Sequence, residues 1–332
     1  MALRNHPSLP KATRDRVRRL ADEMGYHPDP ALSALMGYRH GHRSPPVETL
    51  AWITAWPTED GWRRESPVYA HYYDGARHRA RELGYHLEHF WLREPGMSRS
   101  RFEQVLEARN IRGLILAPQP VPDARLTLNW SRYAAVKIGY TLKSPSLHTV
   151  TCSHFNSMRT VLKRLRARGY RRIGFALQNT VDARVEHAWL GAYLLDRELS
   201  DPEDPIAPLL FRGAQKQRFQ GWFNAHRPEV VVTAEPAFAD TIIDWCRGMD
   251  LAVPEDIGVA VVSNVPLDGR FSGINERSEQ IGKTAVDVLG RLLYRNEIGT
   301  PESPQRILID GTWVEGETIL RRIRRPKTLE TP

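Results

Sequence analysis

The chain has 332 residues, of which 41% are hydrophobic and 26% are charged. This length allows two domains and a short extension, because domains commonly contain about 100 to 200 residues. The composition is typical of a globular protein with ordinary buried cores. No stretch approaches the ~18 apolar residues of a membrane-spanning helix, and the first residues lack the apolar run of a signal peptide. We therefore expect a protein that works in the cytoplasm.

Lys and Arg total 47 against 39 Asp and Glu, which gives a formal net charge of +8. The cations are spread along the whole chain, so the charge fits a polyanionic partner and fits equally well a solvated surface rich in arginine. The two cysteines, Cys152 and Cys246, lie far apart and have no His or Cys neighbours at metal-ligand spacing. The sequence thus predicts no metal site, no disulfide and no cofactor.

The N-terminal region has a helical pattern. Apolar residues recur with the period of an amphipathic helix at Val17, Leu20, Ala21 and Met24, and Gly25 ends the pattern. A second, short helix is expected over 31–36, after the Asp29-Pro30 pair that can cap and begin it. Residues 37–48 are rich in Gly, His, Arg, Ser and Pro, which indicates a linker.

After residue 48 the pattern changes to short apolar strands that alternate with helices. Strands are expected at 50–55, 85–90, 113–117, 134–138, 172–177, 230–233 and 257–262, and helices at 68–83, 99–108, 157–168, 185–198 and 237–248. Such alternation is typical of parallel sheets built from βαβ units. Because it occurs in two successive series, we predict an α/β core of two doubly wound lobes over 49–320, followed by a basic tail over 321–332. A cleft between two such lobes is the expected place for a small ligand.

Several short strings stand in an order found in one known family. They are ALRNHP (2–7), TRDRV (13–17), GYHP (25–28), ALSAL (31–35), RGYRRIGF (168–175) and VPEDIGV (253–259). With these strings the chain resembles bacterial transcriptional regulators of the LacI/GalR family. The resemblance implies a DNA-binding headpiece, a hinge helix and a periplasmic-binding-protein-like core that binds a small effector. It also implies a homodimer on operator DNA.

The chain departs from this family at two places. Met1 stands where only the last turn of the recognition helix is expected, so residues 1–36 are interpreted as a remnant of the headpiece and hinge helix. A misassigned start codon, a deliberately shortened chain or a headless regulator would each explain this, and we favour the first. In the core, Glu235-Pro236 replaces the family's Asn-Asp pair, and the late strand ends in Val262-Ser263-Asn264 instead of acidic residues, so the ligand is expected to differ.

Four residues are candidates for DNA contact. Arg4, Asn5 and Arg14 fit phosphate contacts, which position a protein without reading sequence, although a role as solvated side chains is the more frequent one for such residues. Leu35 corresponds in the resemblance to a hinge leucine that wedges into the minor groove. Its alternative is a core residue of a small helix.

Five residues are candidates for effector binding. The resemblance places Arg184 where the family binds effector, and a guanidinium offers several fixed donors to hydroxyls or a carboxylate. Asn156 falls at a cleft position of the family, and Glu235 and Ser263 follow strands, at the usual ligand edge of a doubly wound sheet. Trp56 is suited to stack on a sugar ring, although core packing is the more frequent role of a tryptophan. A surface ion pair remains the alternative for Arg184. For Asn156, Glu235 and Ser263 the alternative is local capping.

No catalytic motif is present: the sequence lacks Gly-x-Ser-x-Gly, His-Glu-x-x-His and a phosphate-binding Gly-rich loop with lysine. We therefore expect no enzyme, but a homodimeric DNA-binding transcriptional regulator, or repressor, that senses a small polar effector such as a sugar. The alternative is a stand-alone cytoplasmic sugar-binding protein without sequence-specific DNA binding.

Overall fold

The computed structural model describes residues 48–321 except 201–204, 214 and 264–265, and four isolated residues nearer the N-terminus. The chain divides into two compact units, residues 1–47 and 48–332, and the description below concerns the second. The predicted headpiece remnant, hinge helix and linker, with Arg4, Asn5, Arg14 and Leu35, lie outside the described residues. So do 322–332 of the predicted tail.

The first lobe is built on a six-stranded sheet in which all strands are parallel, in the order β13-β7-β5-β3-β1-β2. Its strands are β1 (Thr49–Thr54), β2 (His86–Trp91), β3 (Gly113–Leu116), β5 (Ala134–Ile138), β7 (His148–Cys152) and β13 (Arg306–Ile309). Its helices are α3 (Gly61–Glu65), α4 (Pro67–Glu82), α5 (Arg99–Ala108) and α11 (Ser278–Tyr294). A small parallel pair, β4 (Ala124–Arg125) with β6 (Leu142–Ser144), and a 3-10 turn (Trp130–Arg132) complete it.

Both faces of this sheet are covered, because successive side chains of a strand point to opposite faces. Leu50 and Trp52 of β1 belong to the core under α4 and α11, whereas Ala51 and Ile53 belong to the core under α5. The β strands of such a two-sided sheet are apolar throughout, which explains why β1 reads as a continuous run of hydrophobic residues.

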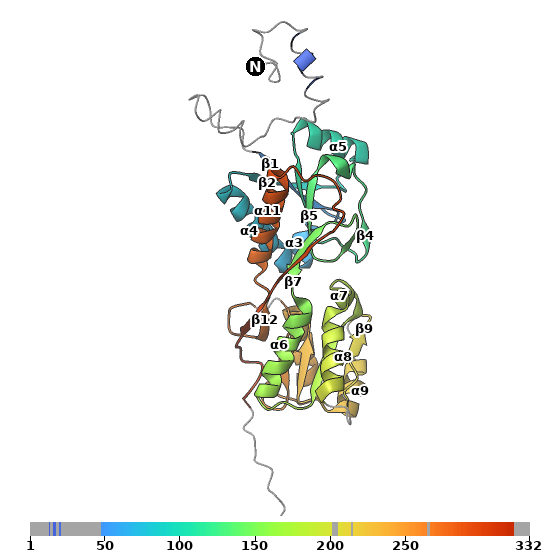
Figure 1. Cartoon of the computed structure of the whole chain (residues 1–332). Coiled ribbons are helices and arrows are strands. Elements are labelled where there is room, and N and C mark those ends of the chain that lie inside the picture. Colours follow the sequence, from blue (N-terminus) through green and yellow to red (C-terminus); the bar gives the residue numbers. More distant parts are fainter. Residues whose placement is uncertain are drawn as a thin grey trace, which may run out of the picture. The chain divides into compact units, whose positions relative to one another are not determined.

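The second lobe contains a six-stranded sheet in the order β14-β12-β11-β10-β8-β9, in which β14 alone is antiparallel to its neighbour. Its strands are β8 (Ile173–Gln178), β9 (Leu209–Phe211), β10 (Val230–Thr233), β11 (Gly258–Val261), β12 (Ser272–Asn275) and β14 (Thr312–Val314). Its helices are α6 (His154–Ala167), α7 (Asn179–Ala183), α8 (Ala188–Ser200), α9 (Lys216–His226) and α10 (Pro236–Arg247). Helices α6 and α8 contribute to one core, and α9 and α10 to the other (Figure 1).

The chain passes between the lobes three times. It leaves the first lobe between β7 and α6, returns between β12 and α11, and leaves again between β13 and β14. The prediction of two doubly wound lobes is confirmed, with one difference. Each lobe takes its last strand from the C-terminal part of the chain, so the two lobes are not two successive segments.

The helix predicted over 185–198 is present, but it begins three residues later, and a short helix that was not predicted precedes it. Helix α7 ends at Ala183 and α8 begins at Ala188, and the turn between them contains Glu186 and His187, both at positive φ. A left-handed conformation is unfavourable for residues with a side chain and needs support from its surroundings. The buried carboxylate of Asp182 supplies that support through contacts with His187 Nδ1 at 2.7 Å and the Leu190 backbone N–H at 3.4 Å.

Within the described residues no helix is both long and apolar enough to cross a membrane.

Candidate ligand cavity between the lobes

A cavity lies between the two lobes, with about 480 Å³ of space that is not filled by atoms and is partly open to solvent. Four aromatic residues line it: Tyr69, Tyr72, Tyr140 and Trp189. Its polar lining consists of Thr141, Thr151, His154, Arg184, Glu235, Ser263 and Glu276. Ligand pockets of this size combine apolar walls with a few convergent polar groups, and this cavity has both.

The fold explains why these side chains meet. Pro118 and Tyr140 follow β3 and β5 of the first sheet, whereas Glu235 and Ser263 follow β10 and β11 of the second. The carboxyl ends of parallel strands share one edge of a sheet, and in doubly wound proteins ligands bind at that edge. Each lobe therefore turns its ligand edge toward the cavity.

Arg184 reaches from the second lobe to the first. Its guanidinium donates to the backbone carbonyls of Gln119 and Pro120, at 2.8 and 2.9 Å, and to the Tyr69 hydroxyl at 2.7 Å. It also lies 6.0 Å from the ring centroid of Trp56, within range of a weak cation–π contact. Because the side chain bonds only to first-lobe groups, Arg184 connects the two lobes beside the cavity.

Glu276 is the centre of a buried polar network. Its carboxylate accepts from the Ser263 hydroxyl at 2.6 Å and from the Tyr72 hydroxyl at 3.4 Å. His154 Nδ1 lies 3.5 Å from the same carboxylate. Burial, and next to it the negative charge of Glu276, raises the pKa of Tyr72 well above its usual value, so the phenol stays protonated and acts as a donor.

Glu235 differs from Glu276, because no described residue forms a hydrogen bond or an ion pair with its carboxylate. Burial raises the pKa of Glu235, and the nearby charge of Glu276 raises it further, while Arg184 acts in the opposite direction. An acceptor that lines a cavity without a partner is available to a ligand that carries hydrogen-bond donors.

Two buried nitrogens of the cavity wall also have no hydrogen-bond partner. They are Trp189 Nε1 and His154 Nδ1, on side chains that are 2% and 8% exposed. Buried polar atoms are nearly always paired in native proteins, so unpaired ones in a cavity wall indicate where a bound molecule is recognised.

Of the five residues predicted to bind effector, the structure brings together Arg184, Glu235 and Ser263 in the cavity lining. Trp56 is 6% exposed and lies behind Tyr69 and Arg184, with its Nε1 donating to the Pro118 carbonyl, so its ring does not line the cavity. Asn156 is exposed and donates to Asp310 at 3.0 Å, outside the lining.

Sequence reasoning missed His154 and Glu276. Each follows directly on a strand that ends at a crossing between the lobes, and such crossings leave no motif in the sequence. Tyr69 and Tyr72 carried a usable signal, because they stand three residues apart in the predicted helix 68–83, which follows the first strand of the first lobe.

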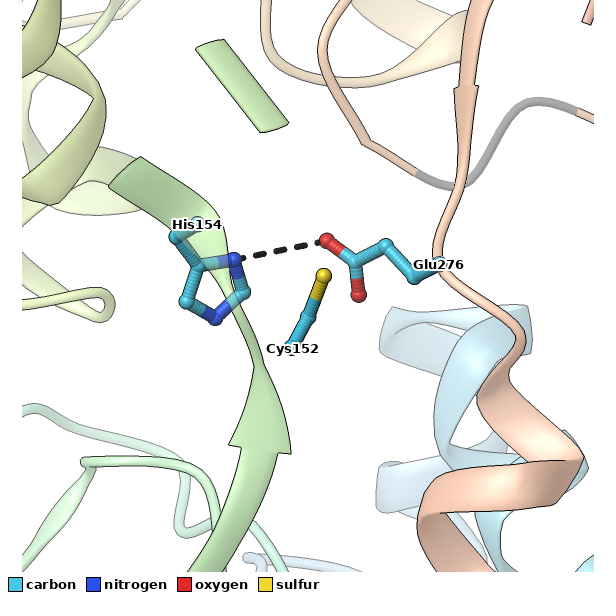
Figure 2. Close-up of side chains that lie close together, drawn as sticks. All are labelled: Cys152, His154 and Glu276. Atoms are coloured by element: carbon cyan, nitrogen blue, oxygen red, sulfur yellow. Dashed lines mark ion pairs between the residues drawn. The ribbon is translucent and has the colours of Figure 1, made fainter. Parts of the chain in front are cut away.

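Cys152, His154 and Glu276 form a compact group at this place (Figure 2). One ligand atom of each lies within 4.8 Å of the others, and all three residues are buried. The sequence predicted no metal site, because the spacing of its cysteines gave no indication of one. The structure adds a carboxylate from a distant part of the chain.

The fold and the cavity together define a two-lobed ligand-binding core. Residues 162–319 match the family of periplasmic binding protein-like domains. No curated protein matches the sequence. Among solved structures, the complex of the transcriptional regulator CelR with cellobiose matches at a TM-score of 0.60 and 16% identity, over 96% of this chain and 94% of that chain.

Two further structures give the same result. The Lac repressor bound to ONPG in the repressed state matches at a TM-score of 0.61 and 18% identity, over 96% of this chain and 93% of that chain. A structure from Rhizobium etli described as a LacI-family regulator matches at 0.62 and 16%, over 82% and 98%. Residues 162–319 thus resemble a periplasmic binding protein-like domain, and the chain has the fold of LacI-family regulators, in agreement with the resemblance seen in the sequence.

Proposed function

We propose that this chain is a ligand-responsive, DNA-binding transcriptional regulator whose effector is a small carbohydrate bound between the lobes. The observation that carries the proposal is the cavity, in which aromatic rings from both lobes and unpaired polar groups of the second lobe face one space. A ligand held by both lobes favours the closed arrangement over the open one, and such a shift of population is how a small molecule controls a distant DNA-binding segment.

The charges of the cavity favour a ligand rich in hydrogen-bond donors. Two carboxylates, Glu235 and Glu276, line it, whereas its one arginine, Arg184, already donates to three first-lobe oxygens. A neutral sugar offers many hydroxyl donors and an apolar ring face for the tyrosines. An anionic sugar phosphate would instead face the like charges of the two carboxylates.

The ligands of similar structures support the same class. One such structure contains cellobiose, a second contains glucose, and a third contains D-xylulofuranose. The identities to these proteins are 13 to 16%, so they support the class of ligand and not a particular sugar.

A thermal-shift screen tests the effector. We expect neutral sugars such as cellobiose or glucose to raise the unfolding temperature by mass action, and sugar phosphates to leave it unchanged. Isothermal titration of each hit then gives the stoichiometry and affinity. A screen in which no carbohydrate binds, or only phosphorylated ones bind, contradicts the proposed effector.

Gel shifts on pools of genomic fragments test DNA binding. Binding is measured with and without the effector and at several salt concentrations. The expected result is sequence-specific binding that resists moderate salt and changes with effector, since nonspecific phosphate contacts alone are lost as salt rises. Effector binding without any specific DNA binding would favour the alternative of a stand-alone sugar-binding protein.

The proposal includes a homodimer, because a two-fold symmetric operator is read by matched half-sites. Sedimentation at micromolar concentration measures this directly, and a clean monomer contradicts it. The proposal includes no catalytic step, and unchanged sugar recovered after prolonged incubation with the protein is the expected result.

A further inference from the structure

The Cys152–His154–Glu276 group lies where the chain crosses between the lobes. Cys152 is the last residue of β7 and His154 the first of α6, on either side of the first crossing, while Glu276 lies in the second crossing, between β12 and α11. The exposed fractions are 0%, 8% and 2%. Thiol, imidazole and carboxylate are the three side-chain types that bind Zn²⁺ in proteins. A buried group that contains one of each is therefore a candidate metal site.

The distances suit a tetrahedral ion. Two nitrogen or oxygen ligands about 2.0 to 2.1 Å from zinc, at a tetrahedral angle, are about 3.4 Å apart. His154 Nδ1 and Glu276 Oε1 are 3.5 Å apart, and the sulfur lies within 4.8 Å of both. The Cys152 thiol, which forms a hydrogen bond with the Ser157 hydroxyl at 3.5 Å, would have to rotate toward the other two ligands to close the remaining gap.

The surroundings of His154 also fit a ligand. Its Nε2 lies 3.3 Å from the Thr151 hydroxyl, and when Nε2 carries the proton it donates to that hydroxyl. The lone pair of Nδ1 then points toward Cys152 and Glu276, and Nδ1 has no hydrogen-bond partner. Metal-bound histidines commonly have their second nitrogen held by such an outer partner.

We propose that Cys152, His154 and Glu276 form a site for a thiophilic divalent ion, of which Zn²⁺ is the natural candidate, in the wall of the ligand cavity. On binding, the thiol releases its proton to solvent, and the thiolate and carboxylate balance the two charges of the ion. Three protein ligands leave a fourth position. Because His154 and Glu276 line the cavity, that position faces the space that a ligand oxygen or a water molecule occupies.

The site goes beyond the proposed function and does not depend on it. An ion bound to residues of two crossings would hold the two lobes in one relative arrangement. Metal and effector would therefore influence each other's affinity, because both depend on that arrangement. The competing interpretation is a hydrogen-bonded network around Glu276 that binds no ion, since Ser263 and Tyr72 already donate to this carboxylate.

Titration with Co²⁺ alone distinguishes the metal site from the hydrogen-bonded network. The titration uses the full chain without an affinity tag, and the protein is first reduced and freed of metal. Co²⁺ replaces Zn²⁺ and produces a strong near-ultraviolet band only when a thiolate is bound. We expect one ion per chain, with that band, and displacement by Zn²⁺. The chain has two cysteines, and both are buried, so Cys246→Ser is a matched control for Cys152→Ser.

Cys152→Ser should abolish the band and weaken Co²⁺ binding by more than about tenfold, whereas Cys246→Ser should retain both. Glu276→Gln, which keeps the shape of the side chain, should also weaken binding by about 10- to 100-fold. If Cys152→Ser does not fold, Glu276→Gln and His154→Gln still report on the site. No thiolate band in the wild-type chain, or a band that survives in Cys152→Ser, overturns the proposal.

Discussion

Glu235 lies in an environment that disfavours the ionised form of its carboxyl group. Its carboxylate lies beside the cavity, close to Glu276, and no described residue forms a hydrogen bond or ion pair with it. Burial and the charge of Glu276 raise its pKa more than Arg184 lowers it, so the folded protein disfavours its ionised form. Natural proteins often retain such unfavourable groups at binding sites, where a ligand supplies the missing partner. Glu235 is therefore expected to lower stability in the free protein and to raise affinity in the complex.

The substitution Glu235→Gln tests this expectation. Loss of the charge should leave the unfolding temperature of the free protein unchanged or higher, and should weaken binding of the sugar found by the screen by at least about tenfold, or about 1.4 kcal/mol. Glu255→Gln, at an exposed position of the same lobe, is the control and should change neither quantity. A variant that binds the sugar as well as the wild type would remove Glu235 from the site.

His89 gives the first lobe a sensitivity to acid. Burial, followed by the charge of Arg63, lowers the pKa of His89 to about 4, and the ring lies 2.8 Å from the Thr54 hydroxyl and packs against Trp62. The unfolded chain has the usual histidine pKa of about 6.5, so between about pH 6.5 and about pH 4 the unfolded state binds more protons than the folded one. Stability from His89 is complete above this window and is lost as the pH falls through it.

Replacing His89 by Gln should therefore flatten part of the acid dependence. We expect urea denaturation at about pH 7 and about pH 5 to show a smaller loss of unfolding free energy in His89→Gln than in the wild type. His71→Gln, at an exposed position on α4, is the control. Equal losses in wild type and His89→Gln would show that other groups account for the acid sensitivity.

Among the elements, helices α4 and α11 determine the geometry of the cavity wall in the first lobe. They pack side by side (Figure 1), and each has a glycine at the contact: a Cβ on Gly282 would lie 1.9 Å from the Tyr72 carbonyl oxygen, and one on Gly75 would lie 2.1 Å from that of Glu279. Helices that approach this closely have no room for a methyl group. The close contact places Tyr72 of α4 near Glu276, just before α11.

The variant Gly282→Ala should separate the two helices. We expect a loss of about 1 to 3 kcal/mol in unfolding free energy, since backbone atoms must move to make room, together with weaker sugar binding. Gly290→Ala on the same helix is a matched control, because its added Cβ would meet only one atom, at 3.9 Å. It should be neutral or stabilising, because alanine favours a helix over glycine by up to about 1 kcal/mol. Equal stability of the two variants would contradict the close packing.

Most helices and strands before residue 262 could be predicted from the sequence, and the reason is physical. Strands such as β10 and β11, and helices such as α5, are buried on regular faces, so their periodicity is set by burial and is visible in the sequence. The strands after residue 262 and the long helix α11 were not predicted. Strands β12, β13 and β14 contain only three or four residues each and lie next to the crossings, and only the fold shows to which sheet each belongs.

The candidate site could likewise be predicted only in part from the sequence. Glu235 and Ser263 could be found because each follows a predicted strand at the ligand edge of one sheet, whereas Arg184 was found only through the family resemblance. Their common location depends on the two lobes facing each other. His154 and Glu276 approach one another only because two crossings run side by side, a relation that no local pattern encodes. Trp56 resembled a stacking platform, but it fills space behind Tyr69.

At the scale of the whole molecule, the question is what holds the two lobes around the cavity. Apart from the crossings, two arginine side chains join them: Arg184, which donates to Tyr69, Gln119 and Pro120, and Arg306, which pairs with Glu186 at 2.9 Å. The second pair is exposed on both sides and is worth at most about 1 kcal/mol. Arg184 is partly buried and donates to two backbone carbonyls and to the Tyr69 hydroxyl of the first lobe.

The sequence led us to expect that Arg184 would face a wet cleft in the free protein and bind effector directly, so that Arg184→Ala would weaken binding and leave stability nearly unchanged. The structure instead places its donors on the first lobe. Loss of the side chain should therefore favour the open arrangement of the lobes in the absence of ligand. A ligand that needs the closed arrangement then binds with an apparent affinity reduced by the fraction of molecules that are closed.

We expect Arg184→Ala to weaken sugar binding by about tenfold to a hundredfold, or about 1.4 to 2.8 kcal/mol, and to increase the radius of gyration of the free protein in small-angle scattering. Saturating sugar should bring the radius back to the wild-type value, because the bound lobes close in both proteins. Arg306→Ala is the control: it removes the exposed contact between the same lobes and should change neither the radius nor the affinity appreciably. Weakened binding with an unchanged radius would mean that Arg184 contacts the effector itself, as the sequence suggested, and equal affinities would exclude both roles.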